Sequence, residues 1–226
     1  MLALLDGDIF VYRIGFASEG ESEGIAISRM AEFVESLVMM PKIGDYQGYL
    51  TGSNNYRKEI AKEAPYKGNR TQAKPQHYDL MREYLVKSWG FVVQEDQEAD
   101  DAIGIKAYTM DPDDYVIYTI DKDLDMIRGW HCKFTQDVEY YVKEEDTLRT
   151  FYKQVLTGDR VDNIPGLKGI GDKKAEKILG EAKEEMELFT AVLKAYDNDI
   201  RRMTEMAQLL WIRRKEGEMW QPPVAS

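Results

Sequence analysis

Nine acidic side chains of this sequence stand in short motifs whose spacing suits a divalent metal. They are Asp6, Asp8, Glu98, Asp100, Asp101, Asp121, Asp123, Asp159 and Asp162. One helical turn would bring the last pair, three residues apart, onto the same face. The i, i+2 spacing of Asp121 and Asp123 places both carboxylates on one side of an extended segment. Mg²⁺ and Mn²⁺ prefer carboxylate oxygens, so the motifs together predict a metal site, although each alone would fit a solvated acidic turn.

A glycine turn and a lysine-rich segment follow the last acidic pair. The residues concerned are Gly169, Gly171, Lys173, Lys174 and Lys177. Glycines leave backbone N–H groups open to an anion, and a helix N-terminus adds a positive potential. The segment therefore predicts a helix-hairpin-helix that binds duplex phosphates. The acidic pair suits a metal ion and the adjacent glycine turn suits a phosphate group. Together they indicate an enzyme that cuts nucleic-acid backbones.

Residues 53–78 form a basic segment in an otherwise acidic chain. Its six basic residues outnumber two acidic ones, and they are Arg57, Lys58, Lys62, Lys67, Arg70 and Lys74. The segment has few large apolar residues and contains two prolines and Gly68. It predicts a mobile arm over the sheet edge, suited to a phosphate backbone, with a plain solvated loop as the alternative. Tyr66 could stack on a base or simply pack.

The net charge of −11 argues at first against a polyanionic partner. Removing the nine motif charges leaves −2 for the rest of the chain, and bound cations would cancel part of the nine. DNA is therefore not excluded.

The apolar runs are too short to span a membrane, and an apolar strand directly after Met1 argues against a signal peptide. The single Cys132 fits a reducing cytoplasm, which is the host cytoplasm if the chain is phage-encoded.

Alternating strands and helices predict an α/β fold with a parallel sheet. Strands are expected at 2–5, 46–51, 91–93, 115–120 and 138–142, and helices at 28–40, 78–89 and 99–109. Ligand sites of parallel sheets gather beyond the carboxyl ends of the strands, where Asp6 and Asp121 fall. The acids are thus predicted to meet at one edge. Gly7 is expected to open a turn, and the chain is expected to be helical from about residue 146 to the end.

Five ordered motifs resemble the flap endonuclease (5′-nuclease) family, especially bacteriophage 5′→3′ exonucleases and the nuclease domain of bacterial DNA polymerase I. The motifs are YKGNR at 66–70, EADD at 98–101, TIDKD at 119–123, GDRVDNIPGLKGIGDKKA at 158–175 and LLWIRRKEGEMW at 209–220. The resemblance implies a PIN-like parallel sheet flanked by helices. It implies a nuclease core at 1–145 with a short basic arch at 53–78, and a helical DNA-binding region at 146–226. That region would contain a helix-three-turn-helix at about 151–182.

The resemblance also implies roles for the motif residues. Two or more Mg²⁺ ions, which Mn²⁺ could replace, would be held by the acids. Asp6, Glu98 and Asp100 would hold the first metal, and Asp121, Asp123, Asp159 and Asp162 the second, with Asp101 in support. Lys67 and Arg70 would reach the scissile phosphate, and the glycine turn with Lys173 and Lys174 would hold the duplex, with a K⁺ ion. Two departures stand out: Ser53 replaces an acid that many members carry, and the arch is short.

These residues lead to a metal-dependent 5′→3′ exonuclease or flap endonuclease as the expected function. Its expected substrates are 5′ ends, nicks or flaps of duplex DNA and also RNA–DNA hybrids, and the chain is expected to act as a monomer without a membrane. Two alternatives remain open. The first is a DNA-structure-binding protein whose first metal site is weakened at Ser53, and the second is a PIN-type ribonuclease. A ribonuclease of that type generally lacks the helix-three-turn-helix.

Overall fold

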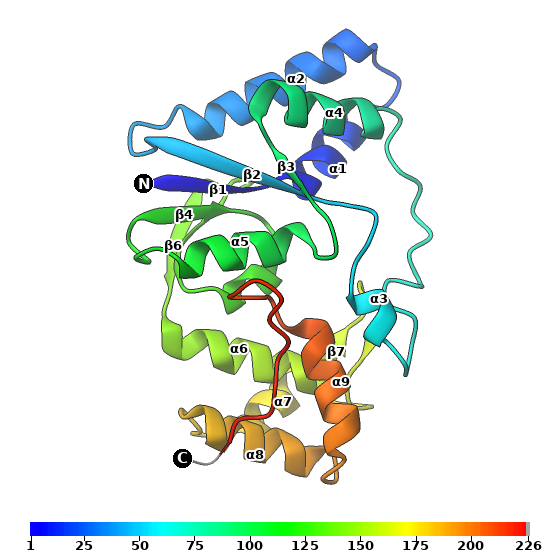
Figure 1. Cartoon of the computed structure of the whole chain (residues 1–226), viewed down its shortest axis with the longest axis vertical. Coiled ribbons are helices and arrows are strands. Elements are labelled where there is room, and N and C mark those ends of the chain that lie inside the picture. The colour runs from blue at the N-terminus through cyan, green and yellow to red at the C-terminus, as the bar shows by residue number, and fades with distance from the viewer. Residues whose placement is uncertain (225–226) are drawn as a thin grey trace.

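A six-stranded sheet forms the centre of the upper half of the molecule (Figure 1). The computed structural model describes residues 1–224. The strands are β1 (Leu2–Asp6), β2 (Asp45–Thr51), β3 (Val92–Gln94), β4 (Tyr115–Tyr118), β5 (Gly129–Lys133) and β6 (Val138–Val142), in the order β3-β2-β1-β4-β5-β6. The first five run parallel, and β6 pairs antiparallel with β5. The predicted α/β class with a central parallel sheet is confirmed.

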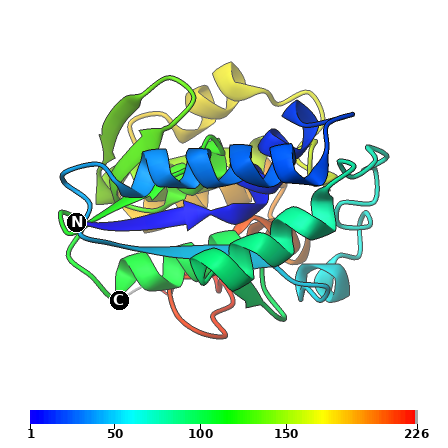
Figure 2. The ribbon, with the colours of Figure 1, turned by 90° about the horizontal axis from the view of Figure 1, so that it is seen from above.

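Helices cover both faces of this sheet, which explains the unbroken apolar run of β1. One face packs on α1 (Gly7–Ala17), α2 (Glu23–Val38) and α4 (Tyr78–Trp89), and Figure 2 shows α2 and α4 lying across it. The other face packs on α5 (Ala99–Tyr108). Ala3 and Leu5 point into the first layer and Leu4 into the second, all fully buried. A strand buried on both sides needs apolar residues at every position.

The lower half is a helical layer joined to the sheet by α6 (Glu144–Thr157). A short hairpin of β7 (Gly158–Asp159) and β8 (Ile164–Pro165) follows, and then α7 (Asp172–Leu179), α8 (Glu185–Ala195) and α9 (Ile200–Leu210). Phe151, Tyr152, Val155 and Leu156 of α6 are fully buried and link the layer to α5 and the sheet. Among the helices of residues 1–224, none has both the length and the apolar character of a membrane span.

Three local predictions differ from the structure. Gly7 begins helix α1 instead of a turn, because the Asp6 carboxylate caps the helix by accepting from the Ile9 N–H. A Cβ at Gly7 would stand 2.6 Å from the Tyr49 carbonyl oxygen, so this close approach of helix to strand requires glycine. Strand β5 was not expected. The chain is also not helical to its end, since α9 stops at Leu210 and residues 211–224 form an extended strap.

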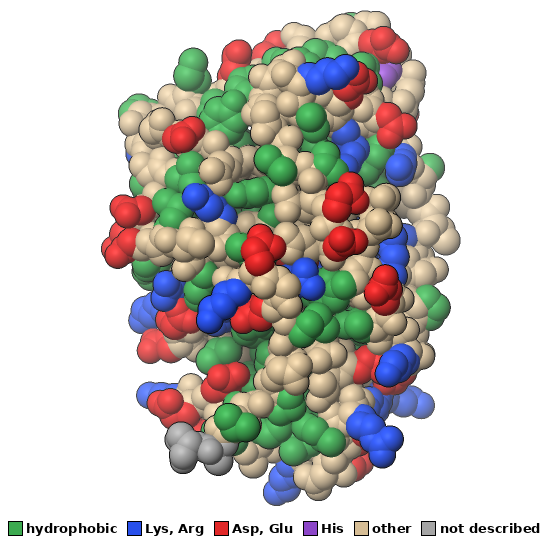
Figure 3. Space-filling view, in the orientation of Figure 1, with side chains coloured by type: hydrophobic (Ala, Val, Ile, Leu, Met, Phe, Trp, Pro, Cys, Tyr) green, Lys and Arg blue, Asp and Glu red, His purple; other side chains and the backbone are tan. Residues whose placement is uncertain are grey.

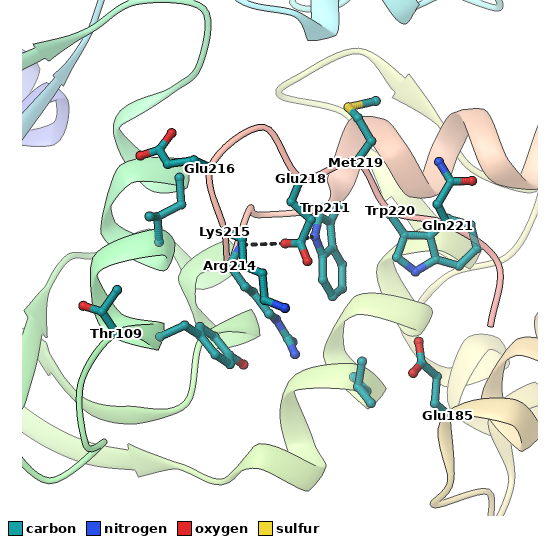
Figure 4. Close-up of a pocket in the computed structure, with 13 residues that line it drawn as sticks. Thr109, Glu185, Trp211, Arg214, Lys215, Glu216, Glu218, Met219, Trp220 and Gln221 are labelled. Carbon is teal, nitrogen blue, oxygen red and sulfur yellow. Dashed lines mark hydrogen bonds between the residues drawn. The ribbon is translucent and has the colours of Figure 1, made fainter. Parts of the chain in front are cut away.

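The strap begins beside α5 at the end of α9 and runs past α6 toward α8, away from the sheet, and with α5 and α6 it lines a hollow of about 770 Å³. Figure 4 shows the side chains around this hollow, with Trp211 and Trp220 reaching in from the strap. Glu218 folds the strap on itself, because its Oε2 accepts from the Arg214 N–H at 2.7 Å and from Trp211 Nε1 at 3.0 Å. The strap is therefore an ordered part of the fold.

A buried ion pair joins the strap, α5 and the beginning of the basic segment. Arg57, in the short helix α3 (Arg57–Ile60), donates to both Asp101 oxygens at 2.6 and 2.9 Å. The same guanidinium donates to the carbonyls of Leu209 and Trp211, and Asp101 also accepts from the Arg213 N–H at 3.1 Å. Arg57 is only 3% exposed. Its expected place among mobile phosphate-binding residues is therefore wrong.

Removing Arg57 should leave a buried charge without a partner. Burial alone would raise the pKa of Asp101, but the Arg57 guanidinium outweighs it and lowers that pKa below the usual value. We expect Arg57→Met to lower the free energy of unfolding by about 3–5 kcal/mol at pH 7, measured by urea denaturation. Because the folded-state pKa is depressed, the contribution is present above pH ~4 and is lost as the pH falls further.

Lys62→Met, at an exposed position of the same segment, is the matched control and should change stability by less than about 0.5 kcal/mol. Equal losses in the two variants, or a loss in Arg57→Met that persists unchanged at pH 3, would contradict this role for the ion pair.

Candidate active site

Five acidic side chains meet in a cleft at the carboxyl edge of the sheet. Asp6 ends β1, Asp8 follows it in α1, Asp121 follows β4, and Glu98 and Asp100 stand at the beginning of α5. The cleft has a volume of about 520 Å³, and Lys67 of the basic segment forms part of its wall. Because β1 pairs in parallel with β4, residues far apart in the sequence reach the same edge.

Burial and mutual repulsion raise the pKa values in this cleft. Burial, followed by the charges of Asp8 and Asp121, raises the pKa of Asp6 to about 8. Burial and the charges of Asp6 and Asp121 raise the pKa of Asp100 well above its usual value. The donors that oppose this are weak, such as Thr119 Oγ1 at 3.2 Å from Asp6 Oδ2. Carboxylates crowded in this way are stabilised by a nearby positive charge.

Gln154, a buried residue of α6, joins two further carboxylates. Its Nε2 atom donates to Asp123 Oδ1 at 3.0 Å and to Asp159 Oδ2 at 3.3 Å. Burial and the charges of Asp121 and Asp159 raise the pKa of Asp123 to about 8. No motif points to Gln154, because a single glutamine in a helical pattern fits any solvated position. Its amide is what allows the two carboxylates to stand side by side.

Asp159 and Asp162 lie on a hairpin turn, so the expected helical turn is wrong. Gly158 has a φ of 69° and ends α6, after which β7 and β8 pair antiparallel. Asp159 Oδ1 accepts from the Val161 N–H at 2.7 Å and stabilises the turn. The two carboxylates therefore have different neighbours: Asp159 faces Gln154, and Asp162 faces the basic segment.

The basic segment, called here the arm (residues 53–77), reaches over the acids. Lys67 Nζ forms an ion pair with Glu98 and lies 3.5 Å from Asp162 Oδ2. Arg70 Nη2 donates to Asp162 Oδ1 at 2.7 Å. Burial alone would lower the pKa of Lys67, but Glu98 and Asp162 outweigh it and raise that pKa, so the ammonium keeps its charge. The arm thus brings two cations to the acids.

Tyr66 is buried and does not stand ready to stack on a base, contrary to one of its two expected roles. Its hydroxyl lies 2.8 Å from Glu98 Oε2 and 2.7 Å from Asp162 Oδ2, between the sheet edge and the hairpin turn. Only 7% of the residue is exposed. Tyr66 therefore ties two acids from different layers to the arm.

Asp8 lines the cleft, whereas Asp101 supports it from outside. Asp101 is fully buried against Arg57 and does not line the cleft, but its Oδ2 accepts from the Glu98 N–H at 3.0 Å and fixes the start of α5. Asp8 accepts from the Thr51 N–H at 3.0 Å and from Arg82 Nη1 at 2.9 Å. Sequence reasoning singled out neither Thr51 nor Arg82. Ser53, where an acid was expected, is exposed and does not line the cleft.

The glycine turn lies in the lower layer, apart from the acids. Gly169 has a φ of 77°, in the left-handed region, and Gly171 directly precedes α7. Lys174 Nζ donates to the Gly169 carbonyl at 2.8 Å, which closes the turn, and Lys173 is exposed. Gly169, Gly171 and Lys173 are therefore exposed where the chain enters α7. Figure 3 shows charges of both signs interspersed on the face it displays.

No three acidic, histidine or cysteine side chains of residues 1–224 are grouped closely enough to form a ready-made metal site. The acids instead bind protein donors, which are Lys67, Arg70, Tyr66, Gln154 and backbone N–H groups. The site thus combines carboxylates at a sheet edge, a cationic arm above them and a helical layer with a glycine turn. This is the architecture of a nuclease with clustered acids.

Comparison with known proteins supports this class. No family model matches the chain. It is 30% identical over 207 residues to a 5′-3′ exonuclease of Mycoplasma pneumoniae, a match that covers 78% of this chain and 70% of that protein. It is 28% identical over 206 residues to DNA polymerase I of Bacillus subtilis, covering 79% of this chain but 23% of that enzyme. The chain belongs to the 5′-3′ exonuclease family, and it spans about a quarter of the length of its DNA polymerase I relatives.

Solved structures share the fold. The bacteriophage T5 D15 protein, crystallised with metal ions, superposes with a TM-score of 0.70 at 18% identity and covers 92% of this chain and 88% of its own. The catalytic core of Rad2 in complex with a DNA substrate gives a TM-score of 0.55 at 15% identity and covers 89% and 67%. At these identities the likeness establishes the arrangement of sheet and helices.

Relieving the crowding in the cleft should stabilise the protein when no metal is added. Asp6, with a folded pKa of about 8, binds a proton that the unfolded chain releases near pH 4, so its ionisation reduces stability as the pH rises between those values. Asp100→Asn removes a carboxyl group whose ionisation is made unfavourable by burial and by the charges of Asp6 and Asp121. We therefore expect a higher Tm for this variant in EDTA at pH 8, by a few degrees in calorimetry, and a smaller gain at pH 5.

Asp113→Asn is the control, because Asp113 is an exposed acid away from the cleft. A lower Tm for Asp100→Asn in EDTA, or the same gain in Asp113→Asn, would argue against repulsion within the cleft.

Proposed function

We propose that the chain is a divalent-metal-dependent 5′-nuclease that hydrolyses phosphodiester bonds near the 5′ ends of duplex DNA. One observation carries the proposal: acids from β1, α5 and the segment after β4 meet in one cleft, with Lys67 and Arg70 of the arm beside them. A bacteriophage T5 D15 relative was crystallised as a pseudo-enzyme-product complex with DNA and metal ions. A phosphate backbone that approaches this cleft would meet cations from the arm and carboxylates from the sheet.

The donor set fits Mg²⁺ or Mn²⁺, since every candidate ligand is a carboxylate oxygen. Asp6, Glu98 and Asp100 would hold one ion. Asp121, Asp123, Asp159 and Asp162 would hold another, with Gln154 fixing two of them. The raised pKa values of Asp6 and Asp123 mark the excess of negative charge that such cations would offset. Divalent cations supply activation of water and neutralisation of charge on the scissile phosphate.

The residues of the arm would then change partners. Lys67 and Arg70 are paired with Glu98 and Asp162. The ammonium and guanidinium groups would leave these acids and donate to the phosphate oxygens of the substrate, where they would stabilise the charge that develops during cleavage. Tyr66 keeps Glu98 and Asp162 in place while this exchange occurs. The proposed catalytic residues of the chain are thus Lys67 and Arg70, together with Asp100, which would reach both cations.

The glycine turn would hold the duplex at a distance from the acids. Residues 151–182 are proposed as a helix-three-turn-helix, in which the N–H groups near Gly169 and Gly171, together with Lys173, bind phosphates. A K⁺ ion at this turn belongs to the same proposal. The proposed substrates are 5′ ends, nicks and flaps of DNA and, as a second class, RNA–DNA hybrids, with the protein acting as a monomer.

Removing the ammonium of Lys67 should impair cleavage more than binding. We expect Lys67→Met to lower the cleavage rate of a 5′-labelled nicked duplex in Mg²⁺ by roughly 10²–10³-fold, because a donor to the phosphate is lost. Lys62→Met, elsewhere on the arm, should keep its rate. Parallel reactions on single-stranded RNA test the ribonuclease alternative, and duplex binding in EDTA without any cleavage in Mg²⁺ or Mn²⁺ would favour a non-catalytic binding protein.

Gln154 should affect the Mg²⁺ concentration that the protein requires for cleavage. Partners that orient metal ligands typically change affinity by 10–100-fold, so we expect Gln154→Leu to raise the half-saturating Mg²⁺ concentration by a factor in that range. The rate at saturating Mg²⁺ should change little. Titration calorimetry with Mn²⁺ gives a readout that does not depend on activity. An unchanged metal requirement would show that Gln154 only packs.

A further inference from the structure

The tip of the arm is fastened to the hairpin turn formed by residues 160–163. Lys67 N–H donates to the Asp162 carbonyl at 2.8 Å. Asn69 Nδ2 donates to the Arg160 carbonyl at 2.6 Å, and from the other side Asn163 Nδ2 donates to the Pro65 carbonyl at 2.8 Å. These three bonds involve backbone groups and are separate from the ion pairs of Lys67 and Arg70. The expected mobile arm is thus held at a defined place.

The backbone on both sides of this contact has an unusual conformation. Lys67 has a φ of 55° and Asn163 a φ of 58°, in the left-handed region. Asparagine adopts this region readily, but lysine does so rarely and at an energetic cost. The bonds between the arm and the turn offset that cost at Lys67, so the conformation of the arm tip depends on its contact with the turn.

The contact also closes one side of the cleft. The cleft is lined by Lys67 and Arg70 on the arm and by Ile9, Tyr12, Arg13 and Phe16 on α1, together with the acids of the sheet edge. Asp162, which is part of the contact, does not line it, and neither do Asp123 and Asp159. Atoms at hydrogen-bonding distance leave no room for a nucleotide between the arm and the turn. The space under the arm is therefore open toward α1 and closed toward the turn.

We propose that this contact is a latch that selects the form of the 5′ end. A terminal nucleotide at a nick can enter from the α1 side without passing beyond the latch. A long single-stranded 5′ flap that runs under the arm must leave on the other side, which requires the latch to open. The protein consequently cleaves nicked 5′ ends faster than long flaps. This inference rests on the proposed 5′-nuclease function.

The test weakens the latch without altering the acids or the cations of the arm. The double variant Asn69→Ala/Asn163→Gly removes both side-chain bonds, and glycine preserves the left-handed backbone at position 163. Asn54→Ala, at an exposed position near the beginning of the arm, is the matched control. Each protein is assayed in Mg²⁺ on the same labelled strand, placed either at a nick or as a long 5′ flap.

The parent protein should cleave the nicked strand faster than the flap. In the double variant the ratio of flap to nick rates should rise by roughly tenfold, as expected for the loss of two hydrogen bonds, with the nick rate unchanged. Asn54→Ala should behave as the parent does. Equal rates on both substrates in the parent, or an unchanged ratio in the double variant, would overturn the latch.

Hydrogen exchange tests the latch independently of cleavage. The Lys67 amide should be protected in the parent and exchange roughly tenfold faster in the double variant. A parent that cleaves neither substrate would count against the proposed function, while the exchange result would still decide whether the latch exists. A freely exchanging Lys67 amide in the parent would refute the latch.

Discussion

The buried ion pair of Arg57 and Asp101 is the constraint on which the arrangement of the site depends. It stands where α5, the arm and the strap meet, and the guanidinium groups of Arg57 and Arg213 lie 4.7 and 3.9 Å from the ring centre of Tyr56. A buried pair adds little net stability compared with apolar packing, but half of a pair is costly. Its main effect is therefore geometric. It fixes the start of α5, which carries two acids of the cleft, against the beginning of the arm, which carries the cations.

The site itself shows how a folded chain keeps many negative charges at one edge. Each acid outside the centre of the cleft has a protein donor: Glu98 has Lys67 and Tyr66, Asp123 and Asp159 share Gln154, and Asp162 has Arg70. The pKa values of Asp6, Asp100 and Asp123 are nevertheless raised, because burial and mutual repulsion outweigh the donors there. The structure thus concentrates unfavourable negative charge at the place where metal cations and a phosphate backbone would bind. Stability is given up there for function.

The sequence predicted the sheet and the gathering of acids because both follow from short-range pattern. The apolar run of β1 followed by an acid, and the clear strand β4 followed by another, are enough to bring Asp6 and Asp121 to one edge. Long-range partners left no such pattern, so Arg57, Gln154 and Arg82 looked like ordinary polar residues. The other errors arise where two local sequence signals compete. Gly7 reads as a turn although Asp6 caps a helix there, and the spacing of Asp159 and Asp162 fits a helix although Gly158 breaks it.

The position of the strap in the chain has a consequence for the order of synthesis. Arg57 binds the carbonyls of residues 209 and 211, and Asp101 binds the N–H of residue 213. A ribosome makes these three residues long after the acids and the arm. A nascent chain that still lacks them can pair Arg57 with Asp101, but the other hydrogen-bonding groups of both side chains have no strap to bind. The joint that aligns α5 with the arm is therefore complete only after residues 209–213 have been made, although the acids and the arm precede them in the chain.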